Sequence, residues 1–345
     1  LLVIFNILLF GVIFFVIARL VQSIVINGIY RVNNSLEKIT RGNLNEVVSV
    51  RTNKEFASLS NGINTTVNAL KDAINEASSR IDTELAFAKA IQHSALPSTF
   101  PAFPDRKDFD IYAQMYTAKE VGGDFYDFFL VDSDHLAVVI ADVSGKGIPA
   151  SLFMMISKSI IKTYALSGLS VSDILYKSNI ALCENNQEDM FVTAFMGILN
   201  TRTGVMRYVN AGHNPPLVRK DNGLYEWLPV KQEFVLAGLP NVRYTEQEIT
   251  FGPRDTLFLY TDGVTEAMNR VEQLYSPKRL IRVLNQFPVS LGLERTIVGI
   301  KEDVDHFAEG TEQADDITML MLRYDQNEEI SHKENPGNPA KEDFI

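Results

Sequence analysis

The pattern of hydrophobic and polar positions divides the chain into three parts. The first 18 residues carry no charged side chain. Between residues 19 and 97 the apolar positions recur with helical spacing. From residue 98 to 325 they form short runs bounded by glycine, proline and polar residues. The pattern therefore predicts an apolar helix, a region of long amphipathic helices, and a domain of strands and helices.

The apolar segment, residues 1–18, is predicted to cross a membrane. Such a helix is about 27 Å long, close to the hydrocarbon thickness of a bilayer, and it is apolar on all sides. Basic residues exceed acidic ones just after it: Arg19, Arg31, Lys38 and Arg41 against Glu37 and Glu46. The positive-inside rule then places the rest of the chain in the cytoplasm, below an inner or plasma membrane. Because the chain does not begin with Met, we expect further sequence upstream.

Two amphipathic helices follow, separated by an extended connector. Gly42 and neighbouring asparagines interrupt the first helix near residue 39, and the alternation in LNEVVSV predicts an extended segment. The second helix is predicted from Glu55 to Leu96, with a mostly apolar heptad seam in which Glu84 is a polar exception. An apolar stripe of that length needs a partner helix, so we predict a homodimer.

Residues 19–75 resemble the HAMP signal-relay module. Residues GNL, 42–44, stand where that family usually has a Gly-Asp-Leu turn, and Glu55 matches the acidic residue that opens its second helix. The glycine that often follows this acidic residue is absent. The resemblance implies a parallel dimer of four helices that passes a conformational change to a coiled-coil linker helix, residues 76–97.

The third part, residues 98–325, is predicted to be an α+β sandwich. Proline residues at 97, 101 and 104 end the long helix. Helices are predicted in pairs, over 147–166 and 171–185 and again over 277–287 and 292–308. Paired strands beside paired helices favour antiparallel sheets with helices on their faces. Predicted strands include DIYAQMY, HLAVVIADV, FVTAFMGIL, GVMRYVNAG, DTLFLYTDG and DITMLMLRY, and a further strand is predicted to start within GGDFYD. The polar tail, 326–345, is predicted to be disordered.

Composition removes several classes of function. The formal net charge is -11, which argues against a nucleic-acid partner because a phosphate backbone requires a basic surface. The single cysteine, Cys183, cannot form an internal disulfide, in agreement with a reducing compartment. No Ser-His-Asp order with an elbow turn occurs, so the sequence offers no competing protein nucleophile.

Carboxylates recur at the ends of the predicted strands. Any one of them alone is more often a turn former or a cap, but four strand ends in one domain favour a shared site. Gathered carboxylates raise one another's pKa unless cations neutralise them, and oxygen ligands without His or Cys select Mg²⁺ or Mn²⁺. Two such ions about 4 Å apart can activate a water for attack on a phosphoryl group. The residues are Asp124, Asp142, Asp262, Asp315 and Asp316.

Five motifs in order across residues 119–324 resemble the PPM family of metal-dependent serine/threonine phosphatases, and more narrowly its SpoIIE/RsbU-type branch. They are GGDFYD, ADVSGKG, NAGHNPP, YTDGVTEA and ADDIT. The resemblance implies an αββα sandwich, two Mn²⁺ or Mg²⁺ ions, and hydrolysis of phosphoserine or phosphothreonine on a partner protein. In that branch the partner is commonly an anti-sigma-factor antagonist.

The resemblance also implies roles for individual residues. Asp124 would bind one ion, Asp142 would bridge both with help from the Val143 carbonyl, and Asp262 and Asp315 would complete the other site. Asp316 would be a neighbour or an alternative ligand, and the only nucleophile would be a metal-bound water. Gly145 and Gly147 would let their loop close on the site, before a helix whose N-terminus points towards phosphate. For the substrate phosphate, Lys119 and Lys146 are the nearby cations, and the choice between them stays open.

Four further interpretations concern two neighbouring residues and two rival functions. Asp127 lies one strand period beyond the others and faces away, and His213 fixes a turn by hydrogen bonds. A two-metal nucleotidyl cyclase also follows a HAMP module, but Phe125 and Tyr126 replace the acidic signature expected after GGD. A non-catalytic docking module on the same fold is the second rival.

Overall fold

The structure is a computed structural model that describes residues 2–184, 186–221 and 223–325. The tail predicted to be disordered, 326–345, lies outside the described residues. The chain forms two compact units, Leu1–Glu84 and Leu85–Ile345. Each unit is described by itself.

The first unit is helical. Helix α1 (Leu2–Val21), a π-helical turn η1 (Gln22–Ile26) and α2 (Asn27–Thr40) follow one another without a break, and α3 (Lys54–Ala95) begins after a connector. The connector is extended because side chains of α3 bond its backbone. Ser60 accepts from the Val50 N–H at 3.2 Å, and Asn64 accepts from the Val48 N–H at 2.9 Å. Both connector valines are buried against α2 and α3.

The second unit contains two five-stranded sheets in which all named strand pairs are antiparallel. The first sheet has the order β1 (Phe109–Tyr116), β10 (Ile317–Tyr324), β9 (Thr256–Tyr260), β6 (Leu217–Arg219), β7 (Tyr225–Trp227). The second has the order β2 (Phe125–Leu130), β3 (His135–Val143), β4 (Val192–Asn200), β5 (Val205–Ala211), β8 (Gln247–Thr250). Strands β3 and β4 are almost wholly buried because both faces of their sheet are covered.

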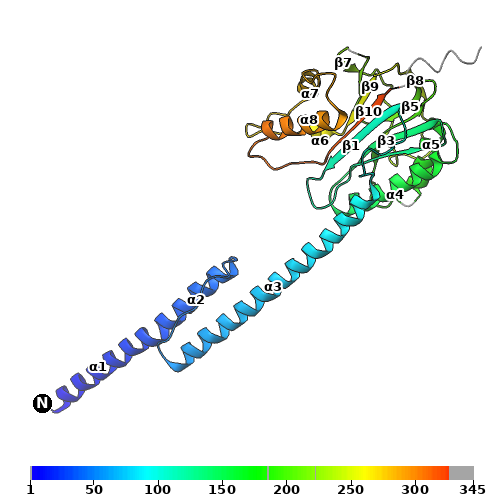
Figure 1. Ribbon diagram of the computed structural model, residues 1–345. Coiled ribbons are helices and arrows are strands. Elements are labelled where there is room, and N and C mark those ends of the chain that lie inside the picture. Colours follow the sequence, from blue (N-terminus) through cyan, green and yellow to red (C-terminus); the bar gives the residue numbers. More distant parts are fainter. Residues whose placement is uncertain (1, 185, 222, 326–345) are drawn as a thin grey trace, which may run out of the picture. The chain divides into compact units, whose positions relative to one another are not determined.

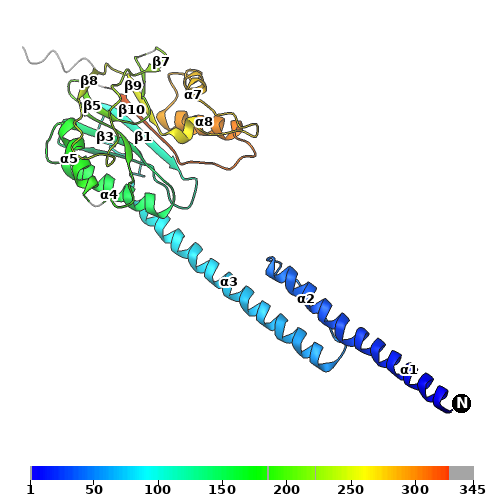
Figure 2. The same cartoon turned by 180° about the vertical axis from the view of Figure 1, so that it is seen from behind.

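Helices cover the outer faces of both sheets (Figures 1 and 2). Helices α4 (Ile148–Ala165) and α5 (Val171–Cys183) pack on the second sheet, and α8 (Leu293–Phe307) packs on β1 and β10 with α7 (Pro277–Leu284) beside it. A single turn, α6 (Asp262–Thr265), follows β9. The predicted sandwich of two antiparallel sheets flanked by helices is therefore confirmed.

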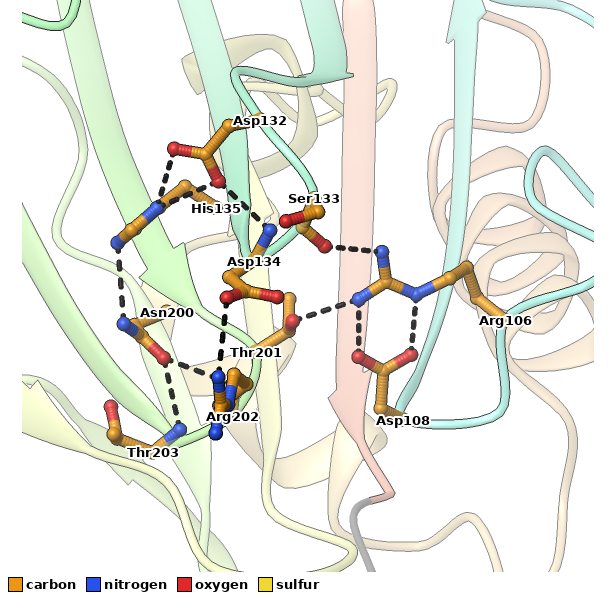
Figure 3. Close-up of polar contacts among 10 residues, drawn as sticks. All are labelled: Arg106, Asp108, Asp132, Ser133, Asp134, His135, Asn200, Thr201, Arg202 and Thr203. Atoms are coloured by element: carbon orange, nitrogen blue, oxygen red, sulfur yellow. Dashed lines mark hydrogen bonds and ion pairs between the residues drawn. The ribbon is translucent and has the colours of Figure 1, made fainter.

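The strand register gives the sandwich two distinct ends. Asp142 pairs with Thr193 near one end of β3, whereas His135 pairs with Asn200 at the other. We name the first the acidic end, defined by Asp124, Asp142, Asp262, Asp315 and Asp316. We name the second the arginine end, defined by the ten residues of Figure 3, which are Arg106, Asp108, 132–135 and 200–203.

At the arginine end, one side chain joins the two sheets (Figure 3). Arg106, just before β1, donates Nε and Nη2 to the two oxygens of Asp108. Its Nη1 donates to the Ser133 carbonyl in the β2–β3 turn at 2.8 Å, and Nη2 also donates to Thr201 Oγ1 after β4 at 2.8 Å. The guanidinium therefore links the first sheet to two turns of the second.

Candidate metal centre

The strand ends bring the predicted acidic residues to one end of the sandwich. Asp124 lies just before β2, Asp142 is the penultimate residue of β3, and Asp262 is the first residue of α6, which follows β9. Asp315 and Asp316 directly precede β10. The carboxylates are close enough for their charges to act on one another. The charges of Asp262, Asp315 and Asp316 act on Asp142, and those of Asp142 and Asp316 act on Asp124.

Burial and mutual repulsion make three of these carboxylates, Asp124, Asp142 and Asp262, resist ionisation. Burial, followed by the charges of Asp142 and Asp316, raises the pKa of Asp124 well above its ordinary value. Burial and then Asp262 and Asp315 raise the pKa of Asp142 to about 7. For Asp262, burial, Glu266 and Asp315 raise the pKa to about 6. The chain itself thus leaves much negative charge at this end uncompensated.

Both carboxylate oxygens of Asp316 accept hydrogen bonds from backbone N–H groups. Its Oδ1 accepts from the Ala118 N–H and its Oδ2 from the Gly123 N–H, both at 2.8 Å. A Cβ on Gly122 would lie 2.2 Å from Asp316 Oδ2, and one on Gly263 would lie 2.0 Å from the Asp316 carbonyl oxygen. The glycines of GGD and TDG are therefore required by close packing around Asp316, which positions the loop before Asp124.

Two threonines hold Asp124. Thr261 Oγ1 donates to Asp124 Oδ2 at 2.6 Å, and the same hydroxyl accepts from the Thr318 N–H at 3.0 Å. Because that N–H occupies the hydroxyl oxygen, the hydroxyl is oriented as a donor towards Asp124, and the Asp124 carboxyl also lies within hydrogen-bonding reach of Asp142. Sequence analysis missed this role, although Thr261 stands directly before Asp262 in the YTDG motif.

The SGKG loop lies against the acidic end. Gly145 and Gly147 have φ values of 89° and 75°, which favour glycine. Between them, Lys146 Nζ lies 2.8 Å from Asp315 Oδ2 and donates to the Ala314 carbonyl at 2.6 Å. Ser144 anchors the start of the loop, since its N–H and Oγ bond the Phe191 carbonyl and N–H, both at 2.9 Å. A Cβ on Gly123 would lie 2.9 Å from the Val143 carbonyl oxygen, so the GGD loop packs against the residue that precedes the SGKG loop.

Asp127 does not join the acidic carboxylates, whereas His213 is linked to them through Thr193, the strand partner of Asp142. Asp127 is buried and pairs with Lys158 of α4 at 2.6 Å. The Nδ1 of His213 lies 2.9 Å from Thr193 Oγ1, and its N–H donates to Asn210 Oδ1 at 2.8 Å. Burial lowers the pKa of His213 to about 4, so this ring is a neutral hydrogen-bonding group that fixes the turn.

A glutamine of the long helix reaches the GGD loop. Gln92 Nε2 donates to the Gly122 carbonyl at 2.6 Å, and Gln92 Oε1 accepts from the Gly122 N–H at 3.0 Å. The side chain is only 4% exposed. Both backbone groups of Gly122 are thereby held by the last turns of α3. This contact could not be predicted from the sequence, because Gln92 is one polar residue among many on that helix.

The donor set at the acidic end fits hard divalent cations. In the part of the chain that the structure describes, no three Asp, Glu, His or Cys side chains already enclose a space for an ion. Three of the carboxylates already have partners within the chain. Asp315 pairs with Lys146, Asp316 accepts from two backbone N–H groups, and one oxygen of Asp124 accepts from the Thr261 hydroxyl. The available groups are carboxylate oxygens whose raised pKa values a cation would relieve, which suits Mg²⁺ or Mn²⁺.

Comparison with known proteins identifies relatives over most of the chain. It is 28% identical over 313 residues to Protein IcfG of Synechocystis sp., covering 82% of this chain and 47% of that protein. To the phosphoserine phosphatase RsbU of Bacillus subtilis it is 28% identical over 245 residues, 70% of each chain. The chain thus spans about half the length of IcfG.

Solved structures of low identity share the fold. The SiaA-PP2C domain of Pseudomonas aeruginosa superposes with a TM-score of 0.64 at 20% identity, covering 72% of this chain and 99% of that one. The phosphatase domain of SpoIIE from Bacillus subtilis, with a fragment of its regulatory domain, gives 0.53 at 16% identity, covering 62% and 63%.

A family model described as Stage II sporulation protein E (SpoIIE) matches residues 132–325, more than half of the chain. The match spans three of the four strand ends that carry the acidic residues, and the resemblance noted from the motifs is thereby confirmed. The chain belongs to the SpoIIE family.

Proposed function

We propose that this chain is a membrane-anchored signalling phosphatase that hydrolyses phosphoserine or phosphothreonine on a partner protein. The observation that carries the proposal is the acidic end: buried carboxylates with raised pKa values gathered at one end of a SpoIIE-family sandwich. The similarity to RsbU, named a phosphoserine phosphatase, supports the same reaction class.

Two Mn²⁺ or Mg²⁺ ions are the cofactors of this proposal. When bound, they would supply the Lewis acidity that generates a nucleophile from water near neutral pH and neutralises phosphoryl charge. The residues that would hold them are Asp124 for one ion, Asp142 and the Val143 carbonyl between both, and Asp262 with Asp315 for the other. Asp124, Asp142 and Asp262 have raised pKa values, so these three carboxylates would gain most from cation binding.

The remaining groups orient this set. The Thr261 hydroxyl fixes the plane of the Asp124 carboxylate, and Asp316 fixes the preceding loop through two backbone N–H groups. Helix α4 begins directly after Gly147, so its first N–H groups and its dipole favour an anion near the loop. Together they would place a phosphomonoester beside the carboxylates without a protein nucleophile.

Membrane anchoring rests on the N-terminal helix. Residues 2–40 contain a stretch long and apolar enough to cross a bilayer, and none of that stretch is buried within the chain. We propose that the phosphatase unit lies on the cytoplasmic side of an inner or plasma membrane, in agreement with the basic residues that follow.

A homodimer would cover a groove in the first unit. The groove has a volume of about 980 Å³ and lies along α2 and the beginning of α3. Leu59 and Leu70 in its lining are about half exposed. Its apolar lining residues are Leu36, Ile39, Leu59, Ile63, Val67 and Leu70. A second copy in a parallel HAMP-like bundle would bury this surface.

Regulation would reach the site through α3. We propose that a change in helix packing around Glu84 alters the hold of Gln92 on Gly122, and with it the loop that carries Asp124. Glu84→Leu, which removes the charged residue from the seam, should fix activity at one level regardless of upstream input. Unchanged regulation in this variant would contradict the proposal.

The substrate would be a phosphorylated partner protein. The SpoIIE/RsbU-type motifs favour an anti-sigma-factor antagonist. A two-metal cyclase is disfavoured because Phe125 and Tyr126 are buried strand residues in place of acidic ligands.

The decisive experiment uses the full chain in lipid nanodiscs. Release of phosphate from phosphoserine and phosphothreonine peptides is measured with Mn²⁺, with Mg²⁺, and with excess chelator, beside an Asp142→Asn control. We expect metal-dependent release that the variant lacks. Conversion of GTP to a cyclic product would indicate the cyclase, and a folded, inert protein would indicate the docking module.

A further inference from the structure

We propose that Lys146 is a tethered cation that exchanges between Asp315 and the substrate phosphate. In the metal-free protein it is the counter-ion of the Asp262/Asp315 half of the acidic end. Once a divalent ion takes Asp315, the freed ammonium binds phosphoryl oxygen. This inference rests on the proposed function and names the residue that positions its substrate.

The contact with Asp315 is direct and joins distant segments. Lys146 Nζ lies 2.8 Å from Asp315 Oδ2 and 2.6 Å from the Ala314 carbonyl oxygen, 168 residues along the chain. The side chain is 46% exposed, so it is held by these two acceptors rather than by burial. The positive charge of Lys146 also lowers the pKa of Asp262, and so partly offsets the repulsion from Glu266 and Asp315.

A divalent ion and this ammonium compete for the same oxygen. Asp315 Oδ2 cannot contact both without placing two cations within a few ångströms, where their repulsion is strong in a partly desolvated site. Binding of an ion by Asp262 and Asp315 must therefore displace Lys146. The competition also accounts for the lack of an open three-ligand cluster among the described residues.

The loop gives the displaced side chain room to move. A Cβ on Gly147 would meet no atom within 4 Å, and one on Gly145 would meet only the Met190 methyl at 4.0 Å. The Lys146 side chain is nearly half exposed, so its four methylenes can rotate and carry the ammonium away from Asp315. The displaced ammonium then binds the phosphate beside the start of α4.

Lys119 is the alternative cation. It is exposed in the loop between β1 and β2, and among the described residues it has no ion pair with the acidic end. Only Lys146 of the two lysines forms an ion pair with Asp315. Lys119→Met is therefore the matched comparison for Lys146→Met.

The test measures metal and phosphate binding separately, on the full chain in nanodiscs. Titration calorimetry with Mn²⁺ alone should show about tenfold tighter binding at one site in Lys146→Met, because the competing cation is gone. With saturating Mn²⁺, the inhibition constant of inorganic phosphate and the KM of a phosphopeptide should each rise about tenfold, with a smaller change in kcat. Lys146→Arg should restore much of the phosphate affinity.

Lys119→Met, and Lys278→Met on α7, should change neither quantity. Equal Mn²⁺ affinity in wild type and Lys146→Met, or a phosphate constant that moves in Lys119→Met instead, would overturn the inference. Failure of the proposed function looks different, since the wild type would then release no phosphate with any metal.

Discussion

Aspartates stand at both ends of the sandwich in opposite surroundings. At the arginine end, partial burial raises the pKa of Asp108. The hydrogen bonds from Arg106, its own backbone and Thr201, together with the charge of Arg106, outweigh burial and leave the pKa below its ordinary value. At the acidic end, burial and neighbouring carboxylates act in the same direction, and the pKa of Asp142 rises to about 7. The same side chain is thus stabilised as an anion at one end and destabilised at the other.

This difference in pKa distinguishes a structural role at the arginine end from a chemical role at the acidic end. Arg106 compensates the charge of Asp108 within the chain and joins the two sheets in doing so. The acidic end leaves its charge for something from outside, which costs stability in the isolated chain and indicates a functional site. Four predictions test this contrast, in order of decreasing effect.

Asp142→Asn should have the largest effect and move activity and stability in opposite directions. Hydrolysis with Mn²⁺ should fall by more than about a hundredfold, because the residue proposed to bridge both ions is lost. Metal-free protein should unfold at a higher temperature, since one source of repulsion is removed. Phosphopeptide assays and thermal unfolding with chelator provide the two readouts. The matched control, Asp134→Asn at the arginine end, should keep its activity.

The pH dependence of stability should show the acidic end directly. The pKa of Asp142 rises from 3.8 to about 7 on folding, so its contribution is fully present below about pH 4 and is lost as pH rises to about 7. We expect a loss of roughly 2–4 kcal/mol in metal-free protein, isolated as wild type minus Asp142→Asn. His213 acts in the opposite direction, losing stability as pH falls from 6.5 to about 4. Chelated urea titrations across this range measure both, and a flat difference curve would refute the assignment to Asp142.

Arg106→Met should destabilise the fold without changing the chemistry. Asp108 loses both hydrogen bonds, and the Ser133 carbonyl and Thr201 hydroxyl lose a donor, for a cost of about 2–3 kcal/mol. In urea unfolding, Arg202→Met should cost less than about 0.5 kcal/mol, because that side chain is 67% exposed. A lower kcat/KM of the folded Arg106→Met protein would show that the two ends are coupled.

Asn200→Ala should have the smallest effect, about 1 kcal/mol. Asn200 Oδ1 accepts from the Arg202 and Thr203 N–H groups, both at 3.0 Å, and its Nδ2 lies 3.2 Å from His135 Nε2 (Figure 3). Asn200→Asp keeps both acceptor bonds and should recover most of the loss. Equal denaturation midpoints for the two variants would mean that the turn bonds contribute nothing.

The sequence predicted most of the long elements and the grouping of acidic residues. Runs of five or more buried residues are readable because strand periodicity and turn residues agree over that length. Strands β6, β7 and β8 and the helix α6 have only three or four residues, too few for any periodicity, and were missed.

What the sequence could not supply were contacts between distant segments. Asp316 bonds the Gly123 N–H across 193 residues, and Gln92 bonds Gly122 across 30. Neither residue type is unusual at its position, so only the fold distinguishes them from surface polar groups. The choice between Lys119 and Lys146 was open for the same reason, because it depends on which lysine lies beside Asp315.

The two bonds at Gly122 and Gly123 have a mechanical consequence. Gln92 holds both backbone groups of Gly122, and Asp316 accepts from the N–H of Gly123, so the end of α3 and the start of β10 meet at two consecutive glycines. Under the regulation proposed above, a change in the packing of α3 would reach the Asp124 loop across only these two residues.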